Sequence, residues 1–212
     1  MNIVILGPQG SGKGTQARLL AEKLGLFYFE SGEFWREKAE KDPRIDEIIN
    51  KKGKLVPDAE AFALTQEFLQ EKSPGLNNLL LDGYPRSLKQ YELLKNWLAG
   101  EGQKIGLAIY LTVSDAEAVR RLSARIVCEK CGEVYNLLTN PPPEKCPCGG
   151  NLVQRPDDTP EAIKKRLAEF HSVTSPLIEV LKKDGILVEV DGERPIAVIA
   201  SDLTKILEEK NG

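Results

Sequence analysis

The 212-residue chain is poor in the residue types that mark redox or proton-transfer chemistry. It contains one histidine, one methionine and four cysteines, and only 6% of its residues are aromatic. The single histidine, His171, lies in a segment of helical periodicity, so we expect a surface or packing residue rather than a proton donor. All four cysteines fall between positions 128 and 148. This clustering argues against a disulfide framework spread along the chain and favours one local site.

Long hydrophobic runs are also missing. No apolar stretch approaches the roughly 18 to 20 residues that span a bilayer, and the apolar residues 2–6 meet Gly7 and Pro8 without a basic leader. No secretory signal is therefore expected, and we predict a cytoplasmic monomer without a membrane partner. The net charge of −3 also argues against nucleic acid as a partner, since proteins that coat it are usually basic. A local arginine cluster can still bind a small anionic substrate.

Short apolar runs alternate along the chain with longer segments of helical periodicity. This order predicts parallel strands joined by crossover helices, and therefore an α/β fold with a doubly wound, five-stranded parallel sheet. The predicted strands are residues 2–6, 26–29, 78–82, 104–111 and 186–190. The predicted helices are residues 15–24, 88–98, 116–124, 160–183 and 195–209.

Two segments interrupt the alternation and predict two small inserted domains. Residues 30–56 are charged and helical in pattern, whereas residues 124–158 hold every cysteine and three consecutive prolines. The second segment is too small to bury a core of its own, so a stabilising element such as a metal is expected there. The predicted core consists of residues 1–29, 57–123 and 159–212.

The strongest motif is the sequence GPQGSGKGT at residues 7–15, between the first predicted strand and helix. Glycines let backbone N–H groups turn inward around phosphate oxygens, and the helix N-terminus adds a positive dipole end. Lys13 places a charge among the β and γ phosphates, and the Thr15 hydroxyl is suited to hold Mg²⁺. The sequence therefore predicts a phosphate-binding loop (P-loop) for a nucleoside triphosphate. It does not by itself distinguish a kinase from a GTPase or a motor.

A second set of residues follows the third predicted strand. Asp82 ends this strand, where ligands bind in open α/β sheets, and its carboxylate can orient the waters around Mg²⁺. Arg86 can bind a phosphate through two parallel hydrogen bonds. Taken alone, Asp82 could be a turn residue before Gly83, and Arg86 a surface charge.

The cysteines form two close pairs, Cys128 with Cys131 and Cys146 with Cys148. Zn²⁺ prefers four such ligands in a tetrahedron, and four thiolates leave no open position for catalysis. We therefore predict a structural zinc site, with a metal-free segment of reduced thiols as the alternative. A nucleic-acid-binding zinc ribbon is disfavoured because acidic residues outnumber lysines between the outer cysteines.

Together these motifs resemble the adenylate kinase family, and the resemblance covers nearly the whole chain. The matching segments are residues 7–16, 31–36, 53–56, 82–86 and 191–195, with Gln90, Arg121, Arg125, Arg155 and Arg166. The resemblance implies Mg²⁺-dependent transfer of the terminal phosphoryl group of ATP to AMP, giving two ADP. It also implies a long lid that carries zinc, although the second pair here is Cys-x-Cys where the family usually has Cys-x-x-Cys.

The resemblance further implies two nucleotide sites and their residues. The implied ATP site comprises Gly10, Ser11, Gly12, Lys13, Gly14, Thr15, Arg121, Arg125, Val134, Tyr135 and Arg194. The implied AMP site comprises Ser31, Arg36, Lys54, Leu55, Val56, Gly83, Tyr84, Pro85, Arg86, Gln90, Arg155 and Arg166. Asp82 and Thr15 would hold Mg²⁺ through water. The implied catalytic cations are Lys13, Arg86, Arg125, Arg155 and Arg166.

Two other functions compete with this interpretation. Another nucleoside monophosphate kinase would use UMP, CMP or GMP as acceptor, or GTP as donor, but Ser31 and Gln90 fit AMP. A regulatory nucleotide-binding or zinc-ribbon protein without turnover would not need Lys13, Arg86 and the other arginines together.

Overall fold

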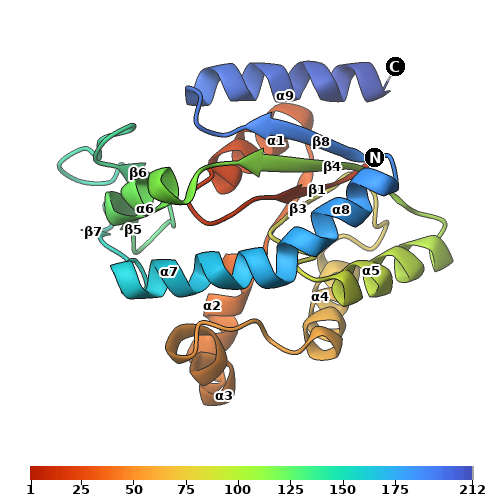
Figure 1. Cartoon of the computed structure of the whole chain (residues 1–212), viewed down its shortest axis with the longest axis horizontal. Coiled ribbons are helices and arrows are strands. Elements are labelled where there is room, and N and C mark those ends of the chain that lie inside the picture. The colour runs from red at the N-terminus through yellow and green to blue at the C-terminus, as the bar shows by residue number, and fades with distance from the viewer. Residues whose placement is uncertain (212) are drawn as a thin grey trace.

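A computed structural model describes residues 1–211. Its centre is a five-stranded sheet in the order β2-β3-β1-β4-β8, with every neighbouring pair parallel (Figure 1). The strands are β1 (Asn2–Leu6), β2 (Phe27–Glu30), β3 (Leu79–Asp82), β4 (Ile105–Thr112) and β8 (Leu187–Asp191). The predicted α/β fold and its five strands are therefore confirmed, and no strand end differs from its predicted position by more than one residue.

Two hydrophobic layers enclose the sheet because successive side chains of a strand point to opposite faces. On β1, Ile3 and Ile5 face one layer and Val4 and Leu6 the other, and all four are at most 1% exposed. A strand buried on both faces reads as a continuous apolar run rather than an alternating one. This is why residues 2–6 were recognisable as a strand.

Helices cover both faces of the sheet (Figure 1). On one face lie α1 (Lys13–Leu24) and α9 (Ile196–Asn211), which contact each other. On the other face lie α4 (Asp58–Lys72), α5 (Leu88–Gly100) and α8 (Ser175–Lys183). No helix within the described residues is long and apolar enough to cross a membrane.

The segment between β2 and α4 is helical, as its charge pattern predicted. It contains α2 (Ser31–Lys41), α3 (Pro43–Asp46) and the π-helical turn η1 (Glu47–Lys51). The helix α4 itself was not predicted. Its buried residues are Ala61, Thr65 and Leu69, and a stripe this narrow, with a polar residue in its middle, gives a weak amphipathic signal.

Residues 125–153 form a separate antiparallel sheet in the order β6-β5-β7, which the sequence did not predict. Its strands are β5 (Arg125–Cys128), β6 (Val134–Asn136) and β7 (Leu152–Val153). This sheet projects from the main one beyond α6 (Asp115–Ser123) (Figure 1). Strands of two to four residues have too little area to bury a core, so the cysteines dominate the packing here.

The helix predicted at residues 160–183 is interrupted. It consists of α7 (Pro160–Glu169), the π-helical turn η2 (Phe170–Thr174) and α8. Pro176 lies in the first turn of α8, and a proline cannot donate the hydrogen bond that would continue an α-helix through this point.

Candidate functional site

The P-loop lies at the carboxyl edge of the main sheet, between β1 and α1. Gly10 has a φ of +87°, and a Cβ there would lie 2.9 Å from the carbonyl oxygen of Ala118. Gly12, with a φ of +89°, precedes the first residue of α1. These left-handed conformations favour glycine, and they end the loop at the positive N-terminus of a twelve-residue helix.

Lys13 is directed back across the loop, and its Nζ donates to the carbonyl oxygen of Pro8 at 3.3 Å. Burial lowers the pKa of Lys13 to about 8, although the charge of Asp82 opposes the shift. A partly buried ammonium with one backbone acceptor is strongly stabilised by an anionic ligand. The loop therefore has the backbone geometry expected of a phosphate site, and the Lys13 ammonium supplies a positive charge that an anion can neutralise.

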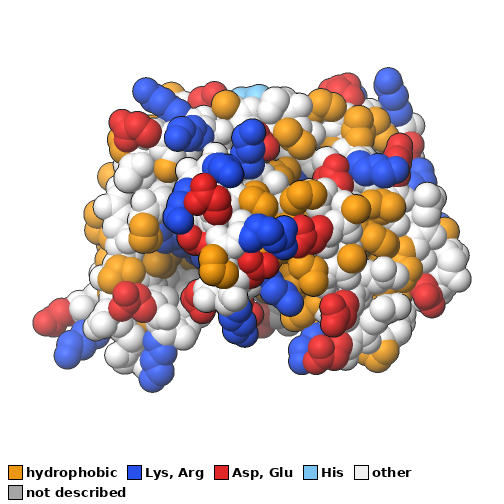
Figure 2. Space-filling model, turned by 90° about the horizontal axis from the view of Figure 1, so that it is seen from below, with side chains coloured by type: hydrophobic (Ala, Val, Ile, Leu, Met, Phe, Trp, Pro, Cys, Tyr) orange, Lys and Arg blue, Asp and Glu red, His pale blue; other side chains and the backbone are white. Residues whose placement is uncertain are grey.

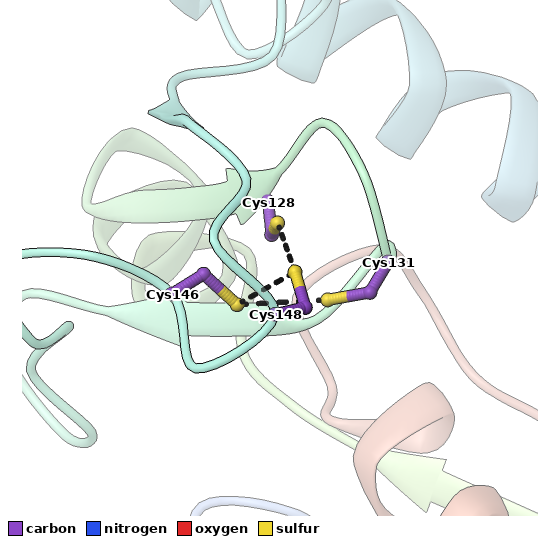
Figure 3. A group of neighbouring side chains, drawn as sticks. All are labelled: Cys128, Cys131, Cys146 and Cys148. Atoms are coloured by element: carbon purple, nitrogen blue, oxygen red, sulfur yellow. Dashed lines mark hydrogen bonds between the residues drawn. The ribbon is translucent and has the colours of Figure 1, made fainter.

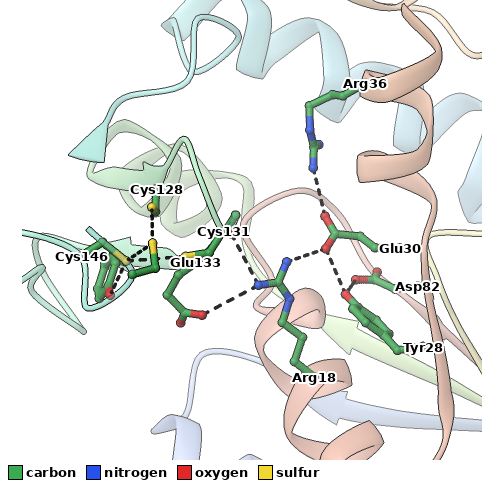
Figure 4. Close-up of polar contacts among 12 residues, drawn as sticks. Arg18, Tyr28, Glu30, Arg36, Asp82, Cys128, Cys131, Glu133 and Cys146 are labelled. Carbon is green, nitrogen blue, oxygen red and sulfur yellow. Dashed lines mark hydrogen bonds and ion pairs between the residues drawn. The ribbon is translucent and has the colours of Figure 1, made fainter. Parts of the chain in front are cut away.

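Asp82 lies at the end of β3, beside Ile5 of β1 and Glu30 of β2. It is 4% exposed, and the Tyr28 hydroxyl lies 3.0 Å from its Oδ2 (Figure 4). Burial raises the pKa of the Asp82 carboxyl above its ordinary value. Within the described residues it forms no ion pair, so this carboxylate is suited to hold a hydrated cation.

The residues after β3 form a compact polar group. Arg86 donates from Nε to the carbonyl oxygen of Gly83 at 2.7 Å and from Nη2 to the Ser31 hydroxyl at 3.0 Å. Its backbone N–H donates to Gln90 Oε1 at 2.8 Å. Burial lowers the pKa of Arg86. The fixed guanidinium and the amide of Gln90 thus lie on the same side of the cleft.

Two arginines from different segments share one buried acid. Arg125 donates to Asp158 at 2.8 and 2.6 Å, and Arg166 donates to Asp158 at 3.0 Å and to Asp157 at 2.7 Å. Arg155 forms no ion pair within residues 1–211. Burial and the charges of Arg125 and Arg36 lower the pKa of Arg155 to about 10. These cations therefore repel one another and are suited to an anion between them.

Two further arginines lie near the loop that follows β8. Arg121 donates to the carbonyl oxygen of Gly192 at 2.8 Å and to Glu117 at 2.7 Å. Arg194 pairs with Asp202 at 2.8 Å. Arg121 also donates to the carbonyl oxygen of Gly10 at 3.4 Å, so this residue of α6 links the β8–α9 loop to the P-loop.

One cleft of about 1890 Å³ joins these groups, more than the roughly 300 to 1,000 Å³ of a typical small-ligand pocket. Its lining contains every predicted ATP, AMP and magnesium residue except Ser31 and Pro85. Ser31 is 1% exposed and contacts Gly83 and Arg86. It therefore lies behind the surface of the cleft and holds these two lining residues in place.

The acidic residues that hold the predicted cations were not singled out from the sequence. They are Glu30, Glu117, Asp157, Asp158 and Asp202, and Tyr28 and Arg18 belong with them. The only local signal was a pair of acids, Asp157 and Asp158, two residues after Arg155. A buried arginine needs a counter-charge, but the sequence does not say which acid supplies it.

The four cysteine sulfurs lie within 4.8 Å of one another (Figure 3). The sulfur of Cys128 is 3.4 Å from that of Cys148, Cys131 is 3.6 Å from Cys146, and Cys146 is 3.5 Å from Cys148. Four ligands at Zn–S distances of about 2.3 Å would be roughly 3.8 Å apart in a tetrahedron. The donors fit zinc, and the shortened Cys-x-Cys pair brings both of its sulfurs into the cluster.

Comparison with known proteins gives one family. The model for adenylate kinase matches residues 5–186. The adenylate kinase of Pyrococcus horikoshii is 39% identical over 98% of this chain and 96% of its own length. The adenylate kinase of Moorella thermoacetica is 38% identical over 94% of both chains. That of Thermosipho melanesiensis is 38% identical over 98% of this chain and 99% of its own.

Proposed function

Because this chain belongs to the adenylate kinase family and transfers the terminal phosphoryl group of ATP to AMP, we propose that the cleft holds the two nucleotides with their phosphates end to end. The observation that carries the proposal is the convergence of Lys13, Arg86, Arg125, Arg155 and Arg166 on that cleft. Five cations exceed what one nucleotide needs, and they match two polyphosphate tails that repel each other.

The donor ATP binds at the P-loop. The backbone of Gly10 to Thr15 surrounds its phosphates, and Lys13 neutralises the β and γ oxygens. Arg121, Val134, Tyr135 and Arg194 hold the base and ribose, while Arg125 reaches the phosphates. The lining of the cleft supports this assignment, since it includes all of these residues.

The acceptor AMP binds between α2 and the turn after β3. Arg36 and Arg86 hold its phosphate, with Ser31 keeping Arg86 in place from below. Lys54, Leu55, Val56, Gly83, Tyr84 and Pro85 form the surrounding wall. Gln90 reads the adenine edge: its amide can donate to a ring nitrogen, and Oε1 keeps a second lone pair beside the bond from Arg86.

The reaction needs alignment and charge neutralisation rather than a base, because the acceptor oxygen of AMP is already anionic. An AMP oxygen attacks the γ phosphorus, the bond to the bridging oxygen breaks, and ADP leaves. Arg125, Arg155 and Arg166 stabilise the charge on the oxygens in transfer. Mg²⁺, held through water at Asp82 and Thr15, supplies further neutralisation when bound. The Asp82 carboxylate is buried and forms no ion pair within residues 1–211, which supports this site.

Residues 30–56 and 124–158 act as an AMP-binding domain and a lid on a core of residues 1–29, 57–123 and 159–212. Both close on bound nucleotide and exclude water, so that transfer rather than hydrolysis follows. A structural Zn²⁺ on Cys128, Cys131, Cys146 and Cys148 keeps the lid folded, and the sulfur spacing supports it. Unchanged distances between core and lid on adding a bisubstrate dinucleotide would count against closure.

The enzyme works as a monomer in the cytoplasm, with neither nucleic acid nor a membrane as partner. One chain lines the whole cleft, and cysteines 128, 131, 146 and 148 form no disulfide with one another, which suits a reducing compartment. On the face shown in Figure 2, basic and acidic side chains are interspersed rather than gathered by sign. Light scattering tests the oligomeric state.

A coupled assay of ADP formation from MgATP tests the proposal against its nearest rival. Rates with AMP, UMP, CMP and GMP are compared, and then rates with GTP as donor. We expect AMP and ATP to give the highest kcat/KM. Preference for a pyrimidine monophosphate would assign the acceptor site to another nucleotide.

A further inference from the structure

Glu30, the last residue of β2, lies where three parts of the chain meet. Its carboxylate accepts from Arg36 of α2 at 3.2 Å and from Arg18 of α1 at 2.9 Å, and the Tyr28 hydroxyl lies 3.2 Å from it (Figure 4). The Glu30 side chain is 15% exposed. One largely buried acid thus serves two arginines on different elements.

Arg18 extends the contact to the lid. Its Nη1 lies 3.5 Å from the carbonyl oxygen of Gly132, which follows Cys131, and 3.9 Å from the Glu133 carboxylate. Gly132 has a φ of +70°, and a Cβ there would lie 3.8 Å from Glu33 Oε1 of α2 and 3.9 Å from Arg18 Nη2. The cysteine turn therefore lies against both α1 and the AMP-binding segment.

The pKa shifts of Glu30 and Arg18 agree with a strong ion pair between these two side chains rather than with a solvated surface charge at Glu30. Burial opposes ionisation, but the hydrogen bond and charge of Arg18, followed by Arg36, lower the pKa of Glu30 below its ordinary value. The pairing with Glu30 likewise raises the pKa of Arg18 against the effect of burial. Charge-assisted hydrogen bonds of this kind are about twice as strong as neutral ones.

Glu30 leaves Arg36 able to bind a phosphate. Only Nη2 of Arg36 contacts the carboxylate, and the structure records no other hydrogen bond of this guanidinium within residues 1–211. Gly32 permits the close approach, because a Cβ there would lie 3.2 Å from Arg36 Nη1. Held by one edge, the guanidinium can present its other N–H groups to an anion.

We propose that Glu30 and Arg18 are positioning residues that link the two inserted segments. Glu30 orients Arg36 toward the acceptor phosphate and, through Arg18, holds the lid turn at Gly132 against the core. Binding of the monophosphate and docking of the lid then depend on the same carboxylate. This inference rests on the proposed function, because it assigns the phosphate at Arg36 to AMP.

The test uses the full-length variants Glu30→Gln, Arg18→Gln and the double variant. Glu67→Gln and Lys164→Gln are matched controls, because these exposed side chains lie outside the cleft and outside the recorded ion pairs of residues 1–211. Three quantities are measured: the Kd of AMP, the KM of ATP, and hydrogen exchange of the backbone amides of residues 129–134 in nucleotide-free enzyme.

We expect Glu30→Gln to raise the Kd of AMP about tenfold, with the KM of ATP within about twofold of wild type. Arg18→Gln should accelerate exchange in the lid turn by about tenfold and raise the Kd of AMP by about threefold. The double variant should bind AMP like Glu30→Gln alone, because Arg18 acts through Glu30. Arg18→Lys should restore much of the protection of the turn.

An unchanged Kd of AMP in Glu30→Gln would overturn the proposal, and so would fully additive effects of the two substitutions. Equal losses for AMP and ATP would indicate a general structural defect and also overturn it. If Glu30→Gln does not fold, Arg18→Gln alone tests the proposal, through the Kd of AMP and the hydrogen exchange of residues 129–134. A wild-type enzyme that makes no ADP from ATP and AMP would instead refute the proposed function.

Discussion

Asp158 and Arg125 form a two-point ion pair, with Oδ2 and Oδ1 accepting from Nε and Nη2 at 2.8 and 2.6 Å. The Asp158 side chain is fully buried and that of Arg125 is 16% exposed. Arg166 reaches the same carboxylate from α7. A single acid thus fixes two cations of the cleft, one from β5 and one from α7.

Replacing Asp158 by Asn should therefore damage both stability and activity. Arg125 would lose its carboxylate partner, and Arg125, Arg155 and Arg166 would repel one another with only Asp157, at 2.7 Å from Arg166, to offset their charge. We therefore expect a loss of roughly 3 kcal/mol in the free energy of unfolding. Loss of orientation should lower kcat about 100-fold. Urea unfolding and the coupled assay measure these effects.

The control for that substitution is Asp115→Asn, which removes an acid from the exposed pair with His171. Its free energy of unfolding should change by no more than about 0.5 kcal/mol. Equal effects of the two substitutions would show that Asp158 has no special role.

Arg155→Met should separate activity from stability. The native cleft lowers the pKa of Arg155 to about 10, first through burial and then through the charges of Arg125 and Arg36. Removing this charge relieves repulsion, so the nucleotide-free Tm should rise by about 2 °C, whereas kcat falls about 1,000-fold. A marked fall in Tm, measured by calorimetry, would contradict this.

Alkaline pH should weaken ATP use through Lys13. Its pKa of about 8 in the native protein lies below the ordinary 10.5, so the ammonium that meets the phosphates disappears as pH rises past 8. The kcat/KM for ATP reports the free enzyme and should fall tenfold per pH unit above about 8. Between pH 8 and 10.5 the unfolded chain binds more protons at this residue, so its contribution to stability rises with pH. If kcat/KM for ATP stays constant up to pH 10, the charge of Lys13 in the free enzyme does not control the use of ATP.

Removal of zinc should unfold the lid. We expect one zinc per chain by atomic emission, and a fall in Tm of at least about 5 °C after chelation or in Cys146→Ser, because binding energy at such a site is folding energy. Wild-type enzyme treated with zinc-saturated chelator is the control. An unchanged Tm in metal-depleted protein would indicate a lid that folds without the ion.

Patterns within one segment were readable from the sequence, whereas contacts between distant segments were not. Residues 2–6 were predicted as a strand because a strand covered on both faces is a continuous apolar run. The P-loop was predicted as a phosphate site because its backbone conformation needs glycines at positions that are close together in the sequence. Asp158 was not singled out from the sequence, since nothing near it indicates that α7 brings Arg166 to it. Glu30 was missed for the same reason: its partners Arg18 and Arg36 meet it only in the fold.

The most direct test of the account is the titration of AMP into enzyme saturated with a non-hydrolysable ATP analogue and Mg²⁺, followed by calorimetry. The account predicts one AMP bound per chain beside the retained analogue, since the cleft has cations for two nucleotides. An enzyme that holds the analogue but takes up no AMP, or that releases the analogue as AMP binds, would contradict it.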